Sequence, residues 1–162
     1  MILLYLDLIE KAVWAGIAAL GFGILFNIPK KVILTVFILG FFAGIVKFVF
    51  LSFDFNVVTS TFLASLFVGI VSIPFAYKVN KPIVVFSIPA IIPMVPGYYA
   101  YKTILGIRKF TFVKMDDMGH EKLLNSIFSN GFMVLFILFA ITVGVSAPML
   151  LLGKDMAKKL KD

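Results

Sequence analysis

The sequence has no cysteine and little charge, and each shortage excludes a class of protein. Without cysteine the chain has no disulfide, no thiolate metal site and no cysteine nucleophile. Charged residues make up 14% of its 162 residues, whereas about a quarter is typical of a soluble domain. Hydrophobic residues make up 62%, and the mean hydropathy is +1.11. This composition excludes a soluble domain and predicts an integral membrane protein.

The residues that catalysis requires are also scarce. The sequence shows no nucleotide-binding loop, no Ser-His-Asp arrangement and no carboxylate pair inside an apolar run. Asp116, Asp117, His120 and Glu121 are metal ligands by residue type, but their spacing matches no strong metal motif. We interpret this cluster as a solvated loop that opens the last helix. We therefore expect no enzyme, no cofactor and no metal site.

Long apolar runs predict the membrane-spanning segments. A helix crosses the hydrocarbon core, ~30 Å thick, with about 20 apolar residues. The sequence has five such runs, which predict an all-α, polytopic bundle that forms one membrane domain over residues 1–162. The flank of the first run holds Asp7 and Glu10 and is not the basic start of a signal peptide, so we expect that run to stay in the membrane. The predicted spans are 12–28, 32–51, 57–77, 82–101 and 127–152.

The links and the lysines suggest how the spans are arranged. Short links after the first three spans predict antiparallel neighbours. The net charge is +7, and nearly all the basic residues lie outside the apolar runs, which is typical of a membrane surface and not of nucleic-acid binding. The lysine bias places the carboxyl terminus in the cytoplasm by eight basic residues to six. The eight are Lys30, Lys31, Lys78, Lys81, Lys154, Lys158, Lys159 and Lys161.

Prolines interrupt the fourth predicted span. A proline has no amide hydrogen to donate to the carbonyl four residues earlier. The carbonyls freed in this way are those of Val85, Pro89 and Ile92, because Pro89, Pro93 and Pro96 follow them by four residues. Their spacing of four and then three residues places them on one face of a helix. Free carbonyls cannot face lipid, so they must meet water, another helix or a cationic group.

A glycine follows the prolines and predicts a new helix start. Gly97 is the residue best able to take a non-helical dihedral, after which Tyr98–Leu105 can restart a helix that includes Tyr101. The new start offers amide donors to a carboxylate, so carbonyls and amides together would form a cradle for a zwitterion. Broken helices of this kind mark the substrate sites of many secondary transporters. The alternative is a static kink whose carbonyls bond to a hydroxyl or water, which is our interpretation of Pro74 with Ser72 and of Pro148 with Ser146, each near a helix end.

A few other polar residues lie in or near the spans. Lys47 is the one charged residue within a predicted span, and it either faces a substrate path or extends toward the membrane surface. Asp54 is an interfacial acid or a proton-handling group. Small residues at Gly16, Ala19, Gly23, Gly40 and Gly44 predict close helix packing. We expect the hydroxyl and amide groups of Asn27, Asn56 and Ser87 to cap helix ends or bond back to carbonyls. Ser60, Thr61 and Ser65 either do the same or share a face toward a path.

Four segments, taken together, resemble the threonine/serine exporter family, and in particular its short membrane-only subunit, which is similar to the one linked to succinate export in enteric bacteria. They are spread in order over nearly the whole chain, and the proline-glycine segment is the most specific of them. The segments are Gly21–Pro29, Ser60–Ser65 with Gly69, Ile92–Gly97 with Tyr101, and Gly144 with Pro148.

The resemblance implies export of a small polar metabolite, with proton coupling, across the inner cell membrane by a multi-pass protein. It also implies a larger membrane subunit as a partner. Pro93, Pro96, Gly97 and Tyr101 are the motif positions that it carries over to this sequence. If five related spans of the partner meet the five predicted here, the two halves would insert with opposite orientations. The alternative function is a structural subunit that assembles the complex without contacting substrate.

Overall fold

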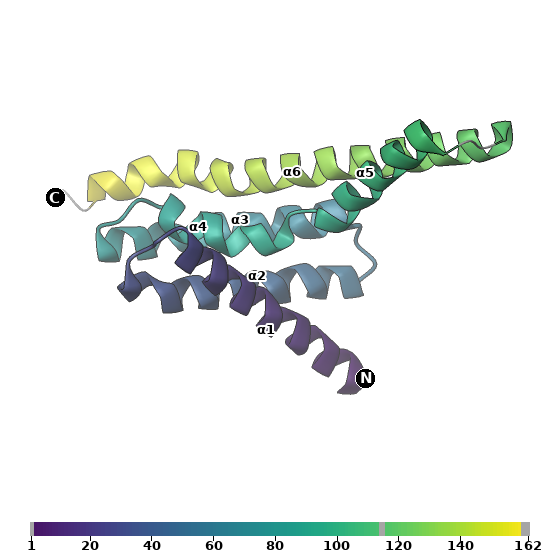
Figure 1. Ribbon diagram of the computed structural model, residues 1–162. Coiled ribbons are helices and arrows are strands. Elements are labelled where there is room, and N and C mark those ends of the chain that lie inside the picture. Colours follow the sequence, from purple (N-terminus) through teal and green to yellow (C-terminus); the bar gives the residue numbers. More distant parts are fainter. Residues whose placement is uncertain (1, 114–115, 160–162) are drawn as a thin grey trace. The chain divides into compact units, whose positions relative to one another are not determined.

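The computed structural model describes residues 2–113 and 116–159, and these residues form helices and no strand (Figure 1). The all-α prediction is therefore confirmed. The helices are α1 (Ile2–Leu25), α2 (Lys30–Ser52), α3 (Val57–Val79), α4 (Val84–Ile91), the 3-10 helix η1 (Ile92–Met94), α5 (Gly97–Phe112) and α6 (Asp117–Lys159).

Within residues 2–113 and 116–159, four helices are long and apolar enough to cross a membrane. The broken pair Val84–Met94 and Gly97–Phe112 makes a fifth if it is one span, which agrees with the predicted count. The first helix starts earlier than the predicted span at residue 12, and its added turns contain an exposed ion pair of 2.6 Å between Asp7 and Lys11, one turn apart. The four unbroken candidate spans are Leu6–Leu25, Lys30–Ser52, Val57–Val79 and Met118–Leu152.

The chain divides into two compact units, one of Met1–Met94 with Ala140–Asp162 and the other of Val95–Phe139. In the first unit, α1 packs on α2 through small residues. A β-carbon added to Gly40 would overlap the side chain of Ala19, and one added to Gly44 would lie 3.1 Å from the Cα atom of Ala12. The predicted glycines thus lie where the two backbones approach each other. That the whole chain is one membrane domain stays a prediction.

Three turns in the first unit share one design. Each follows a helix and contains an asparagine or aspartate in the left-handed region, with φ of 53° at Asn27, 62° at Asp54 and 52° at Asn80. The residue after each of them donates its amide to a carbonyl five residues earlier: Ile28 to Gly23, Phe55 to Phe50 and Lys81 to Ala76. These are Schellman caps, which satisfy carbonyls at the ends of α1, α2 and α3 and let consecutive helices run antiparallel.

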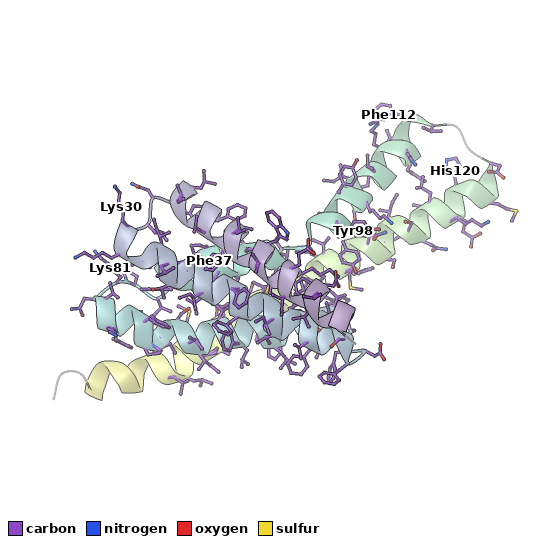
Figure 2. All side chains as sticks on the ribbon, turned by 90° about the horizontal axis from the view of Figure 1, so that it is seen from below. Lys30, Phe37, Lys81, Tyr98, Phe112 and His120 are labelled. Atoms are coloured by element: carbon purple, nitrogen blue, oxygen red, sulfur yellow. The ribbon has the colours of Figure 1, made fainter. Side chains whose placement is uncertain are left out.

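The second unit is a helical hairpin of α5 and the first part of α6. A β-carbon added to Gly106 would lie 2.6 Å from Ile127, and the rings of Phe110 and His120 lie 5.4 Å apart. Figure 2 shows Phe112 and His120 at the same end of the hairpin. The loop predicted over Asp116–Glu121 is wrong from Asp117 onward, because α6 begins there. With 43 residues, α6 has about twice the length that a membrane crossing needs.

Candidate functional site

The broken span contributes α4 and η1 to the first unit. Pro89 lies inside α4 and is buried, and the α-helix changes to a 3-10 helix at Ile92. The predicted α-helical alignment of free carbonyls therefore applies to Val85 and Pro89, whereas Ile92 lies in the tighter turn that also holds Pro93. The phenyl rings of Phe86 and Phe75 stack at 6.5 Å and hold α4 against α3.

A recess of about 370 Å³ opens beside these two carbonyl positions. All six of its lining residues are apolar, so it excludes polar side chains and leaves the backbone as the source of polar contacts. The volume is ample for a small metabolite. The lining residues are Phe26, Ile28, Val84, Val85, Ile88 and Pro89.

Lysines surround the end of the first unit that holds this recess. Lys30 follows Ile28 by two residues, and Lys81 precedes Val84 by three. Figure 2 shows Lys30 and Lys81 at the same end of the helices. Lys31 and Lys78 start α2 and end α3 at this end, as the sequence predicts. Lys161, the last of the predicted cytoplasmic lysines, lies outside the described residues. Lys30, Lys31, Lys78 and Lys81 give this end a positive potential that attracts carboxylates.

The second unit begins with the turn that starts α5. Pro96, with φ of −78° and ψ of 57°, is the centre of an inverse γ-turn, and the amide of Gly97 donates to the carbonyl of Val95 at 2.8 Å. Gly97 itself is the first helical residue of α5 and does not have positive φ. The prediction that Gly97 takes the non-helical dihedral is therefore wrong, because the rigid ring of Pro96 makes the turn.

The first turn of α5 exposes amides and aromatic rings. Within the described part of the chain, no side chain caps this end. The amide of Gly97 is used in the γ-turn, so those of Tyr98 and Tyr99 are the donors that the helix start offers. The side chains of Tyr98 and Tyr101 are both 63% exposed, and the Lys102 ammonium lies 4.7 Å from the centre of the Tyr98 ring.

The predicted hydroxyl residues of α3 lie together in the core of the first unit. Ser60, Thr61 and Ser65 are fully buried. The Ser65 hydroxyl donates to the Phe62 carbonyl at 2.8 Å and lies 3.3 Å from the Ala140 carbonyl of α6. Ser72, which the sequence suggested only as a hydroxyl beside the proline at Pro74, is a fourth fully buried hydroxyl of α3.

The two prolines interpreted as kinks near helix ends differ from that expectation. Ser72 Oγ makes no hydrogen bond among the described residues, so it does not satisfy a carbonyl freed by Pro74. Pro148 lies well inside α6, which continues to Lys159, and its ring packs against Gly69 of α3. The polar residues that follow Pro148 in the sequence suggested that the helix ends near it, but α6 continues through them.

The two charged candidates, Lys47 and Asp54, differ in burial: Lys47 is half-buried and Asp54 is exposed. Lys47 falls on the same face of α2 as the buried residues Gly40, Ala43 and Val36, by the 3.6-residue period, and its side chain is half-buried. Asp54 is exposed in the turn after α2, where its left-handed backbone explains its presence. Lys47 is thus the charged group on the packed side of its helix.

Comparison with known proteins identifies the family of this chain. The model of the family described as "Threonine/Serine exporter, ThrE" matches residues 11–151. The chain belongs to the threonine/serine exporter family. The match includes every segment that carries the resemblance in the sequence, and the family consists of membrane transporters and not enzymes.

One relative of the chain in this family is an uncharacterized protein of Haemophilus influenzae (strain ATCC 51907 / DSM 11121 / KW20 / Rd). It is 29% identical over 146 residues, which cover 90% of this chain and 48% of the relative. The chain thus spans about half the length of the curated relative it matches. No solved structure matches the chain.

Proposed function

We propose that this chain is a membrane subunit of an exporter for threonine and serine, or for short dicarboxylates such as succinate, in the inner cell membrane. The family supports the class of exporter, and the proton gradient is the driving force that we propose for it. All of the candidate substrates are small, polar and carry at least one carboxylate. They therefore need a polar route through a bundle whose composition is overwhelmingly apolar.

The observation that carries the proposal is the recess beside Val85 and Pro89 at the lysine-rich end. Pro89 cannot donate an amide to the Val85 carbonyl, so a backbone acceptor is available next to the recess. The lysines of this end raise the local concentration of carboxylates, and the carbonyls then offer acceptors to an ammonium group. A substrate that carries both groups fits these surroundings better than an uncharged one.

The length of the relative supports a partner. The relative is about twice as long as this chain: the matched region makes up 48% of it, and the rest lies outside the match. We propose that a larger membrane subunit supplies the remainder in this system, and that it inserts with opposite orientation if it has an odd number of related spans. Lys47, on the packed face of α2, would then interact with substrate or with an acidic residue along the path.

The test is efflux from cells that express this chain with and without the proposed partner. Cells are loaded with labelled threonine, serine or succinate, and release is followed before and after the proton gradient is collapsed. We expect release of at least one of the three to require both chains and the gradient. If no release depends on this chain, the exporter function is wrong.

The same assay separates transport from the alternative role in assembly. Pro93→Ala and Pro96→Ala are purified with the partner, and efflux is divided by the amount of assembled complex. A transport role predicts normal assembly with reduced efflux per complex. Reduced assembly with unchanged efflux per complex would show a structural subunit instead.

A further inference from the structure

Five hydroxyl side chains are fully buried in the first unit, and two of them differ from the rest. Three donate to a carbonyl of their own helix, as hydroxyls in membrane helices ordinarily do. These are Ser60 to Asn56 at 3.0 Å, Ser65 to Phe62 at 2.8 Å and Ser87 to Ile83 at 3.3 Å. Among the described residues, Thr61 Oγ1 and Ser72 Oγ make no hydrogen bond. Both side chains are 0% exposed.

An unpaired hydroxyl in a protein core is costly. Burying one without a partner costs about 1–3 kcal/mol, and lipid offers no hydrogen bond to compensate. Both residues lie on α3 with carbonyls of the preceding turn close by, and both side chains nevertheless lack an acceptor. Thr61 and Ser72 are therefore positions on α3 at which a solute or water that forms hydrogen bonds would stabilise the protein.

The two hydroxyls lie along one line of α3. Eleven positions separate them, which is about three helical turns, so they face the same direction. On one side of this line Phe75 stacks on Phe86 of α4, and on the other side Ser65 and Gly69 contact α6. Thr61 and Ser72 therefore lie along the seam where α3 meets both α4 and the end part of α6.

A third polar group borders the same seam. Pro148 has no amide hydrogen for the carbonyl of Gly144. Gly144 packs against Ser65. Pro148 packs against Gly69, and a β-carbon added to Gly69 would lie 3.1 Å from the Cγ atom of Pro148. The α6 side of the seam thus contains a backbone acceptor that has lost its helical donor, opposite the line of α3 hydroxyls.

We infer that Thr61 and Ser72 form two successive binding positions on the solute path, along the seam between α3, α4 and α6. This inference rests on the proposed function and names the residues that would serve it. A hydroxyl both donates and accepts, so it suits the ammonium, carboxylate and hydroxyl groups of a small zwitterion and the waters around it. The two positions are about 16 Å apart along the axis, so one small solute meets them in turn.

Cysteine labelling tests the inference directly, because the sequence contains no cysteine of its own. Thr61→Cys and Ser72→Cys each place a single thiol on the seam, and Ile73→Cys places one at an equally buried position of α3, about 100° around the helix from Ser72. In membranes that contain the full chain and its partner, a water-soluble methanethiosulfonate should modify the first two at least about tenfold faster than the third. Equal and slow rates at all three positions would overturn the inference.

Removal of the hydroxyls supplies a second readout. Thr61→Val and Ser72→Ala should leave the melting temperature unchanged or raise it, because each removes an unpaired buried group, and each should reduce efflux at least about fivefold. Thr111→Val is the matched control, since its hydroxyl is exposed and bonds to Ile107 at 3.0 Å. Normal efflux in both seam variants would contradict the inference while leaving the exporter function intact. Absence of any chain-dependent efflux would instead contradict the function, and the labelling rates would still report on the seam.

Discussion

Gly144 of α6 lies directly against Ser65 of α3, so closely that a β-carbon on residue 144 would overlap the serine hydroxyl oxygen. The same added atom would lie 2.9 Å from the Phe62 carbonyl, which is backbone and cannot move aside easily. Gly69 repeats the arrangement from the other helix, where a β-carbon would lie 2.8 Å from the Val145 carbonyl. The two helices therefore approach each other through reciprocal glycines, as membrane helices do at close crossings.

The first prediction follows from this contact. Gly144→Ala should lower the stability of the folded protein by about 1–3 kcal/mol, because the added methyl group forces the helices apart. The measurement is the melting temperature of the purified protein in detergent. Gly21→Ala is the control, since Gly21 has nothing within 4 Å of its β-carbon position and should be neutral or slightly stabilised. Equal melting temperatures for the two variants would show that the contact does not hold.

The second prediction concerns the left-handed turn after α3. Asn80→Ala should cost about 1–2 kcal/mol, because alanine at a φ of 52° is strained. Asn80→Gly should retain or raise stability, since glycine adopts this conformation without a steric penalty. Thermal unfolding of the two variants compares them. The turn assignment is wrong if glycine proves more damaging than alanine.

The third prediction compares two glycines of α5. Gly97 has negative φ and no atom within 4 Å of its β-carbon position, so Gly97→Ala should preserve stability or add up to about 1 kcal/mol. Gly106→Ala should be destabilising, because its β-carbon would lie 2.6 Å from Ile127. Yield and melting temperature check both. A loss of efflux in well-folded Gly97→Ala would then come from the helix start itself and not from misfolding.

The fourth prediction concerns orientation. Single cysteines at Lys30 and Lys81 should react with a membrane-impermeant thiol reagent from the same face of the membrane, because both lie at the lysine-rich end of the first unit (Figure 2). A cysteine in place of the exposed Phe53 should react from the opposite face, since it follows the other end of α2. The positive-inside bias predicts that the lysine-rich end is cytoplasmic. Labelling of Lys30→Cys and Lys81→Cys from different faces would exclude the up-and-down arrangement.

The sequence was sufficient to predict the helices that cross the membrane, since their lengths follow from apolar runs and the thickness of a bilayer. It also predicted the broken fourth span, because proline chemistry is local. The N-cap at Asn56 is local as well, and its side chain accepts from the Thr59 amide at 2.7 Å as expected. The same local rules failed at the turn before α5. Both Pro96 and Gly97 were able to form this turn, and the structure shows that Pro96 forms it.

The hairpin of α5 and α6 shows a second limit. Charges around residue 116 suggested a loop, yet α6 begins at Asp117, where the Asp116 side chain accepts a hydrogen bond from the Gly119 amide at 3.2 Å and caps the helix. Aspartate is common both in loops and at the N-cap of a helix, so the charges alone did not show where the loop ends and the helix begins.

By itself, the sequence determined the protein class, the approximate spans and the family, because these depend on composition, periodicity and short motifs. The tertiary structure alone decided which polar groups are satisfied. Ser60 and Thr61 are adjacent hydroxyls that look equivalent in the sequence, and both are buried. One bonds to its own helix and the other makes no bond among the described residues. The difference arises because successive residues of a helix face different neighbours, so only the packed bundle separates a structural hydroxyl from one available to a solute.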